Sequence, residues 1–194
     1  MAKRALVTKA SSDFGGVSRL KNTKRVFVAA NQIGQAAVTG TWALENASGV
    51  ITLGTDDAST TNVFQIPLPA AFSDAEMQSG SGVTDRGVKV LGVELLYQVA
   101  TSALGAFDLD IYSVVVDADG DPAATEVVTT LTPDTVGDDG TEVDDHRMAA
   151  LIASNDRFFL DSGRVVYALA EITDGTSSDV NIFGAIWHLE VTEE

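Results

Sequence analysis

Residues 87–116, GVKVLGVELLYQVATSALGAFDLDIYSVVV, are the stretch that most constrains how this chain can fold. Apolar side chains recur at every second position from Leu91 to Val99, and residues 107–111 alternate between apolar and acidic. A period of two is typical of a strand with one face on a core, and branched and aromatic residues suit a pleated sheet. The stretch therefore predicts two strands joined as a hairpin by the small residues 101–106. The predicted core face comprises Leu91, Val93, Leu95, Tyr97, Phe107, Leu109 and Ile111.

The predicted hairpin needs partners on both of its faces. Its strands are longer than the usual five or six residues or so, and a lone hairpin is unstable in water, so a second sheet is expected over the core face. The opposite face is also too apolar for open water. We expect it to be covered by a neighbouring subunit or by the N-terminal segment. The predicted subunit-interface residues are Val88, Val90, Leu96, Tyr112 and Val114.

Strand patterns separated by turn residues continue to the end of the chain, and no helical pattern of useful length appears. The remaining expected strands cover residues 26–30, 36–44, 50–53, 63–69, 125–132, 146–153, 164–172 and 181–191. Residues 164–172 are almost continuously apolar, which predicts burial on both faces. Six strand aromatics are expected in the core: Tyr97, Phe107, Phe159, Tyr167, Phe183 and Trp187. From about residue 60 to the end, these patterns predict an all-β antiparallel β-sandwich with a strand count near eight.

Charge divides the chain into two parts. Residues 1–25 hold seven cations and one acid, a net charge of +6, whereas the other residues carry −22 within a total of −16. We expect an extended basic N-terminal arm over residues 1–35 and a sandwich domain over residues 36–194, with its core strands from about residue 60. The arm is either ordered against a partner or a disordered terminus. The cations predicted to bind a partner are Lys3, Arg4, Lys9, Arg19, Lys21, Lys24 and Arg25.

The acidic body should be repelled by nucleic acid and by anionic membranes, so neither is expected as a partner. The sequence also lacks an apolar run long enough to span a bilayer and the apolar segment of a secretion signal, so a soluble chain made in the cytoplasm is expected.

Few residues suggest chemistry. The chain has no cysteine, and His146 and His188 lack the spaced partners of a zinc site. The phrase beginning at Asp117 resembles a calcium loop, but position twelve is Val128 in place of the required glutamate. One acidic loop has two possible interpretations, a solvated surface or a binding site for a divalent cation. Its acidic residues are Asp138, Asp139, Glu142, Asp144 and Asp145. No nucleophile and base pair can be nominated, so no catalytic residue, cofactor or metal is predicted.

Several strand motifs resemble a known family. These are RGVKV (residues 86–90) leading into VELLYQV, then FDLDIYSV, DSGRVVY (161–167) and FGAIWH (183–188). They look like the small jelly-roll decoration, or cement, proteins of tailed bacteriophages, over roughly residues 60–194.

The resemblance implies a jelly-roll sandwich that is homotrimeric, sits on the exterior of the virion capsid, and binds the major capsid protein. It implies a structural role without enzymatic activity. The alternative reading is a lectin-like or receptor-binding jelly-roll module of a phage tail or fibre. Such a module would carry aromatics in its loops, whereas here the loops are acidic and small.

Overall fold

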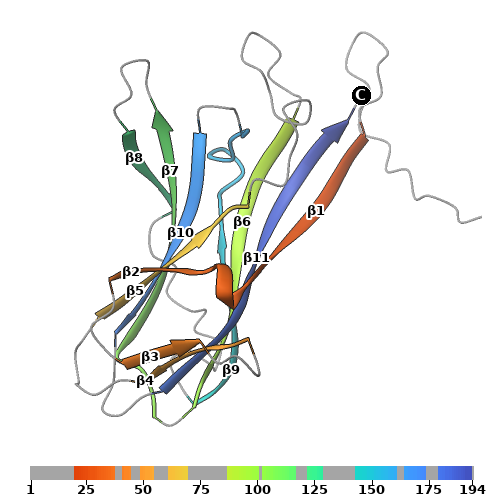
Figure 1. The fold of residues 1–194 in the computed structure, drawn as a ribbon. Helices are drawn as coiled ribbons and strands as arrows, with labels where there is room; N and C mark the ends of the chain where they lie inside the picture. The colour runs from red at the N-terminus through yellow and green to blue at the C-terminus, as the bar shows by residue number, and fades with distance from the viewer. Residues whose placement is uncertain are drawn as a thin grey trace, which may run out of the picture.

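The computed structural model describes residues 20–37, 41–44, 49–54, 61–69, 87–100, 102–116, 122–128, 143–160, 164–173 and 179–193. They form two antiparallel sheets packed face to face (Figure 1). Sheet A contains β1 (Leu20–Ala29), β3 (Thr41–Leu44), β4 (Ile51–Gly54), β6 (Gly87–Val99), β9 (Asp144–Leu151) and β11 (Asp179–Glu193). Sheet B contains β2 (Gly34–Ala37), β5 (Thr61–Pro67), β7 (Ala106–Val116), β8 (Pro122–Val128) and β10 (Arg164–Thr173). A single 3-10 turn, η1 (Ala30–Gln32), links β1 to β2.

The strand order is that of a jelly roll. In sheet A, β11 lies between β6 on one side and both β1 and β4 on the other, with β9 beyond β6 and β3 beyond β4. In sheet B the order is β2-β5-β10-β7-β8. The eight longer strands therefore run β1-β11-β6-β9 in one sheet and β5-β10-β7-β8 in the other, which interleaves early and late strands as a jelly roll does. The predicted fold class, an all-β antiparallel sandwich of jelly-roll type, is confirmed.

The predicted hairpin over residues 87–116 is wrong. Its two strands, β6 and β7, belong to different sheets and face each other across the core, where the rings of Tyr97 and Phe107 stack with centroids 4.6 Å apart. Between them the chain crosses the sandwich; Leu104 is buried, and the N–H of Gly105 donates to the carbonyl of Thr173 at 2.9 Å. The alternation of apolar and polar residues cannot distinguish a hairpin within one sheet from two strands in facing sheets, because each strand buries one face in either arrangement.

The core contains the predicted positions of β6 and β7 except Leu91, together with the inner faces of β5, β10 and β11. Trp187 of β11 is fully buried and donates from its indole Nε1 to the carbonyl oxygen of Pro67 in the opposite sheet, at 2.9 Å. The expected burial of residues 164–172 on both faces is wrong. One face points inward and comprises Val166, Ala168, Ala170 and Ile172, whereas Val165, on the other face, is 57% exposed.

A β-bulge moves Val88 and Val90 out of the predicted interface and into the core. Val90 pairs with Leu189 and Gly92 with His188, so Leu91 is an extra residue on β6. The extra residue reverses which side chains face inward. Val88 and Val90 are therefore fully buried with Val93, and Leu91, expected in the core, is only half-buried.

The basic segment expected in the arm is partly a strand of the sandwich. Residues 20–29 form β1 and pair without a break along β11, from Leu20 opposite Glu193 to Ala29 opposite Gly184. Val28, Ala30 and Ile33 lie in the core, so this part of the chain is fixed by apolar burial. The predicted extent of the arm, through residue 35, is corrected accordingly. Residues 1–19 lie outside the described residues.

Gly92→Ala tests the bulge in β6. Gly92 has φ of +155°, and an added Cβ would lie 2.3 Å from the carbonyl oxygen of Ala150 on β9. We expect the substitution to lower the free energy of unfolding by about 2 to 4 kcal/mol, because the strained backbone and the neighbouring strand must both shift. Gly34→Ala is the control, since its Cβ would make ordinary contacts at 3.7 Å. Equal denaturation midpoints for the two variants would contradict the bulge.

Candidate functional site: two outer faces of the sandwich

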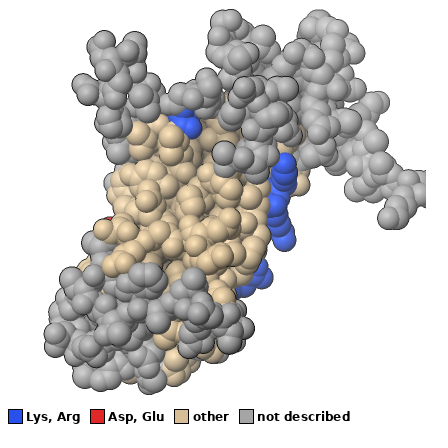
Figure 2. All heavy atoms as spheres, viewed as in Figure 1, with Lys and Arg blue, Asp and Glu red and all other residues tan. Residues whose placement is uncertain are grey.

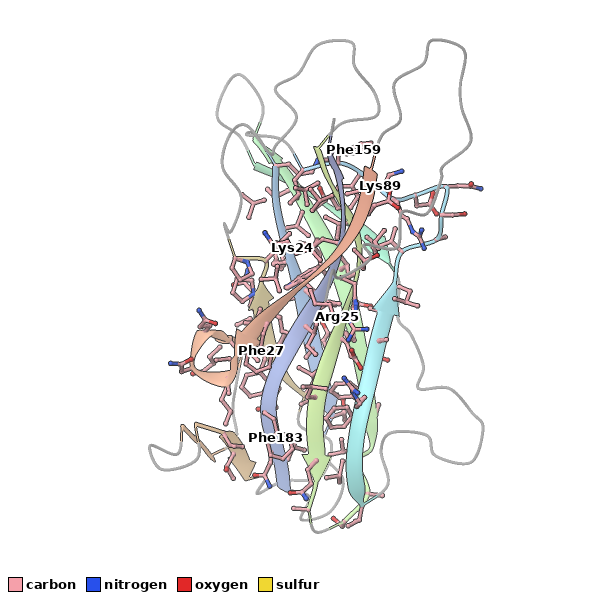
Figure 3. The ribbon with its side chains drawn as sticks, turned by 90° about the vertical axis from the view of Figure 1, so that its right-hand side faces the viewer. Lys24, Arg25, Phe27, Lys89, Phe159 and Phe183 are labelled. Atoms are coloured by element: carbon pink, nitrogen blue, oxygen red, sulfur yellow. The ribbon has the colours of Figure 1, made fainter. Side chains whose placement is uncertain are left out.

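The outer face of sheet A carries exposed apolar side chains beside cations. We call it the sheet-A face, and it comprises the outward side chains of β1, β6, β9 and β11. Phe27 on β1 is 56% exposed, Phe183 on β11 is 41% exposed, and Leu151 on β9 is 58% exposed. Figure 3 looks onto this face and shows Phe27 and Phe183 toward one end and Lys89 with Phe159 toward the other. Large apolar side chains exposed on one face are a feature of interaction surfaces.

Phe27 is held in place by a glycine. A Cβ on Gly184 would lie 2.6 Å from the carbonyl oxygen of Val28 and 2.9 Å from Cζ of Phe27, so the ring lies directly against the bare backbone. Gly184 follows a second bulge, at which Phe183 is the extra residue on β11. This bulge turns Phe183 outward, away from the core position expected for it. Phe27 itself faces outward by the regular alternation of β1, whose pairing with β11 has no register shift.

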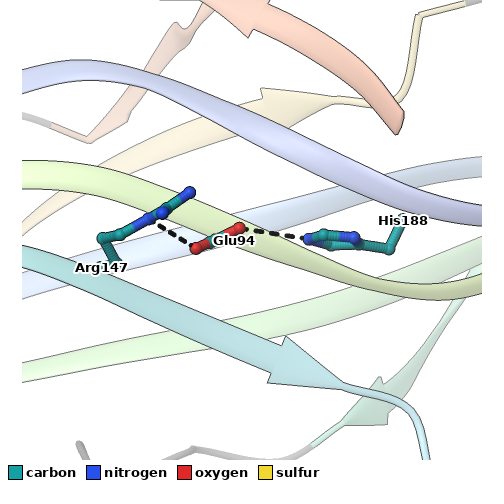
Figure 4. A network of polar contacts seen from close by, with 3 residues as sticks. All are labelled: Glu94, Arg147 and His188. Atoms are coloured by element: carbon teal, nitrogen blue, oxygen red, sulfur yellow. Dashed lines mark hydrogen bonds and ion pairs between the residues drawn. The ribbon is translucent and has the colours of Figure 1, made fainter. Parts of the chain in front are cut away.

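A polar network crosses the middle of the sheet-A face (Figure 4). Glu94 on β6 lies between two neighbours: Nε of Arg147 on β9 is 2.7 Å from its Oε1, and Nε2 of His188 on β11 is 3.2 Å from its Oε2. Only 16% of the Glu94 side chain is exposed, against 63% for Arg147. The acid is thus largely neutralised within the face, while the cation beside it stays open to a partner.

Cations outnumber acids among the described side chains of this face and its edge. Lys24 and Arg25 on β1 are exposed, Arg147 is on β9, and Nζ of Lys89 lies 5.1 Å from the ring centre of Phe159. Figure 2 shows Lys and Arg side chains along the side of the molecule formed by β1. The acids there are Glu94 and Glu190. This excess of cations contrasts with the net charge of −16 on the whole chain. A face of this kind suits contact with an acidic surface on a partner protein.

The outer face of sheet B is apolar at one end. We call it the sheet-B face, and it comprises the outward side chains of β5, β7 and β10. Tyr112 and Tyr167 are cross-strand neighbours whose rings stack at 5.5 Å with an angle of 11° between their planes. Val114 pairs with the exposed Val165 next to them. Because the two rings stack, each covers part of one face of the other.

The other end of the sheet-B face is acidic. Asp108 pairs across the strands with Glu171, and Asp110 lies two residues further along β7. Burial raises the pKa of Asp108 above its usual 3.8, and the nearby charge of Asp110 raises it further. A negative charge at Asp108 is therefore disfavoured by its surroundings.

The structure places the predicted site residues in several different environments. Leu96 is half-buried on the sheet-A face, and Tyr112 and Val114 are half-buried on the sheet-B face. Lys21, Lys24 and Arg25 lie on β1, paired with β11. Asp144 and Asp145, expected in the acidic loop, begin β9. The predicted residues outside the described part of the chain are Lys3, Arg4, Lys9, Arg19, Asp138, Asp139 and Glu142.

Phe183 was expected in a strand with its ring in the core, as were Phe159 and Tyr167; the structure leaves Phe183 exposed and the other two partly exposed. A glycine within a strand often marks a bulge, and the Phe183-Gly184 pair carries that signal, as does Leu91-Gly92. Within the described ranges, no group of three or more His, Asp or Glu side chains is arranged to hold a metal ion. The described part of the chain also contains no helix with the length and hydropathy to cross a bilayer.

Comparison with known proteins gives only distant structural similarity. No family model matches the sequence, and no curated protein does. A low-affinity xylan-binding module of Roseburia intestinalis aligns over 87% of this chain and 96% of its own, with a TM-score of 0.36 and 15% identity. An infectious bursal disease virus structure aligns over 98% of this chain and 36% of its own (TM-score 0.33, 11% identity), and a bacteriophage CBA120 tailspike domain over 89% and 19% (0.33, 9%). The similarity is to β-sandwiches of jelly-roll type and carries no information on what this chain binds.

Asp108→Asn tests the acidic end of the sheet-B face. Since the folded-state pKa lies above 3.8, the folded state binds more protons than the unfolded state between 3.8 and the raised value, and stability falls as pH rises through that window. We expect the amide to raise the thermal midpoint at pH 7 and to lose this gain as the pH falls below 3.8. Asp156→Asn, in an exposed turn, is the control. A gain for Asp108→Asn that is independent of pH would contradict the assignment.

Proposed function

We propose that this protein is a structural component of a virus particle, a decoration or cement protein that binds the outside of a phage head and stabilises it as a homotrimer. The observation that carries the proposal is that both outer faces of the sandwich present apolar side chains to the outside. Phe27 and Phe183 do so on the sheet-A face, and Val165 beside Tyr112 and Tyr167 does so on the sheet-B face. Exposed apolar side chains gathered on one face are a feature of surfaces that pack against a partner, which supports this role.

Charge supports a second contact, made by the N-terminal segment. Lys3, Arg4, Lys9 and Arg19 precede β1, which continues the basic run through Lys24 and Arg25 along the edge of sheet A. The segment joins the sandwich body at the start of β1, on that edge. We assign it to the major capsid protein, with the cations meeting acidic groups on the shell. The proposed role requires contacts and rigidity and needs no catalytic group or cofactor.

Charge removal in the N-terminal segment tests this assignment. The full-length chain is mixed with purified capsids that lack it, and binding is measured by co-sedimentation. Replacing Lys3, Arg4, Lys9 and Arg19 by Gln should weaken binding by about tenfold or more, since each lost contact in a charged interface costs on the order of 1 kcal/mol. Binding of the unmodified chain should also fall as salt rises, because dissolved ions screen contacts between opposite charges.

The matched control keeps the charge and changes the side chains: Lys3→Arg, Arg4→Lys, Lys9→Arg and Arg19→Lys. This variant should bind as the unmodified chain does. Undiminished binding by the Gln variant would refute the anchoring role. Binding of the chain to glycans, with no binding to capsids, would replace the proposed function by the lectin-like one.

A further inference from the structure

We propose that the outer edge of β1 binds an extended strand of another protein, which carries an acidic side chain opposite Arg25 and an apolar side chain opposite Phe27. The added strand extends sheet A by one strand and runs antiparallel to β1, as neighbouring strands do throughout this sheet. The inference rests on the proposed function in one respect only, that the strand is then assigned to the capsid shell.

β1 is a long strand with one paired side. It has ten residues, pairs with β11, and has no strand on its other side within the described ranges. Figure 1 shows it on the outer side of β11. The pairing has no register shift, and the strand contains no proline. Edge strands are commonly shortened, bulged or interrupted by proline, so a long regular edge is a ready template for another strand.

The backbone at the end of β1 shows which residues face this edge. The carbonyl oxygen of Val28 points toward β11, since a Cβ on Gly184 would lie 2.6 Å from it. The N–H of Ala29 points the other way and donates to Oε1 of Gln32 at 3.0 Å. Successive residues of an antiparallel strand alternate between the two sides, and the pairing is unbroken. The residues that share the outward orientation of Ala29 are therefore Thr23, Arg25 and Phe27.

The edge is closed at Ala29 and open before it. The side chain of Gln32 occupies the outward N–H of Ala29, whereas no described group bonds the outward N–H and C=O of Thr23, Arg25 and Phe27. The side chains of these three residues are exposed, and Phe27 is 56% exposed (Figure 3). Side chains directly opposite each other on neighbouring strands make contact. An apolar residue opposite Phe27 therefore covers the part of the ring that Gly184 leaves open.

Charge gives the added strand its acid. Arg25 is exposed, and within the described ranges it has no ion pair. Its neighbour in register, His188, is bound to Glu94, while Lys24 and Glu190 have contacts of their own. A carboxylate opposite Arg25 therefore forms a cross-strand charge pair without displacing an existing one.

The same charges disfavour a second copy of β1 as the occupant. The strand contains Lys21, Lys24 and Arg25 and no acid. Antiparallel pairing of two copies over its full length places Lys24 or Arg25 opposite the same residue of the other copy. Like charges directly opposite each other destabilise a sheet, and lysine on an edge strand is a common protection against self-association. The occupant is therefore a strand of a different sequence.

Hydrogen exchange with a synthetic strand tests the inference on the full-length chain. The probe is a capped peptide of about ten residues, the usual length range of a strand, with valine opposite Phe27, glutamate opposite Arg25 and threonine elsewhere. Amide exchange is followed by NMR as the peptide is added. The N–H groups of Thr23, Arg25 and Phe27 should exchange about tenfold more slowly or less, because each gains a hydrogen bond. Those of Lys24 and Val26, which already face β11, should change least.

Two altered peptides test the contacts separately. A peptide with lysine in place of glutamate should bind about threefold to tenfold more weakly, because an attraction at Arg25 becomes a repulsion. A peptide N-methylated at the residues opposite Arg25 and Phe27 should not bind, whereas methylation opposite Lys24 and Val26 should be tolerated. Only hydrogen bonding along the edge of a strand gives this alternation.

A charge exchange provides the matched control. The variant Arg25→Glu should prefer the lysine peptide to the glutamate peptide. Val165→Glu places a carboxylate at an exposed position on the other sheet and should bind as the unmodified chain does. Circular dichroism and thermal midpoints establish that both variants are folded.

Three results would overturn the inference. These are unchanged exchange at all three outward amides, equal affinity for the glutamate and lysine peptides, and protection of these amides that rises with protein concentration alone, which would place a second copy on the edge. Capsid co-sedimentation tests the proposed function separately. A chain that sediments with capsids but binds no peptide keeps that function and loses this inference; one that binds the acidic peptide but no capsid does the reverse.

Discussion

The hydrogen bond from Trp187 to the carbonyl of Pro67 joins the two sheets at the centre of the sandwich. An indole N–H buried without a partner costs roughly 1 to 3 kcal/mol, so the orientation of Trp187 is tied to the end of β5. Pro67 cannot donate from its own nitrogen, but its carbonyl remains free to accept this bond. With Trp187 fixed inward, its neighbours Ile186 and His188 must face outward. The sheet-A face is therefore determined from inside the core.

Much of the fold could be predicted from the sequence because burial on one face leaves a period of two. The all-β class, most strand positions and the inner residues of β7 follow from this pattern. The pairing of strands does not. Residues 87–116 look like a hairpin, yet β6 and β7 lie in different sheets and meet only through core contacts such as Tyr97 with Phe107. Local alternation records which side is buried and holds no information on which strand is the neighbour.

The candidate faces were harder to predict, for a related reason. One extra residue in β6 and one in β11 reverse the alternation, so that Val88 and Val90 turn inward and Phe183 turns outward. Strict alternation placed all three on the wrong side. Each extra residue directly precedes a glycine with positive φ, Gly92 and Gly184. The glycines were visible in the sequence, but the close approaches that require them, to Ala150 and to Val28, arise only in the folded sheet.

The proposed function requires both outer faces of the sandwich to be covered in the native assembly. Hydroxyl-radical footprinting of the chain, free in solution and on intact particles, measures this directly through the oxidation of Phe27, Phe183, Tyr112 and Tyr167. We expect the phenylalanines of the sheet-A face and the tyrosines of the sheet-B face to be oxidised more slowly on particles than in the free chain at low concentration. Equal oxidation rates in the two states on either face would contradict the account.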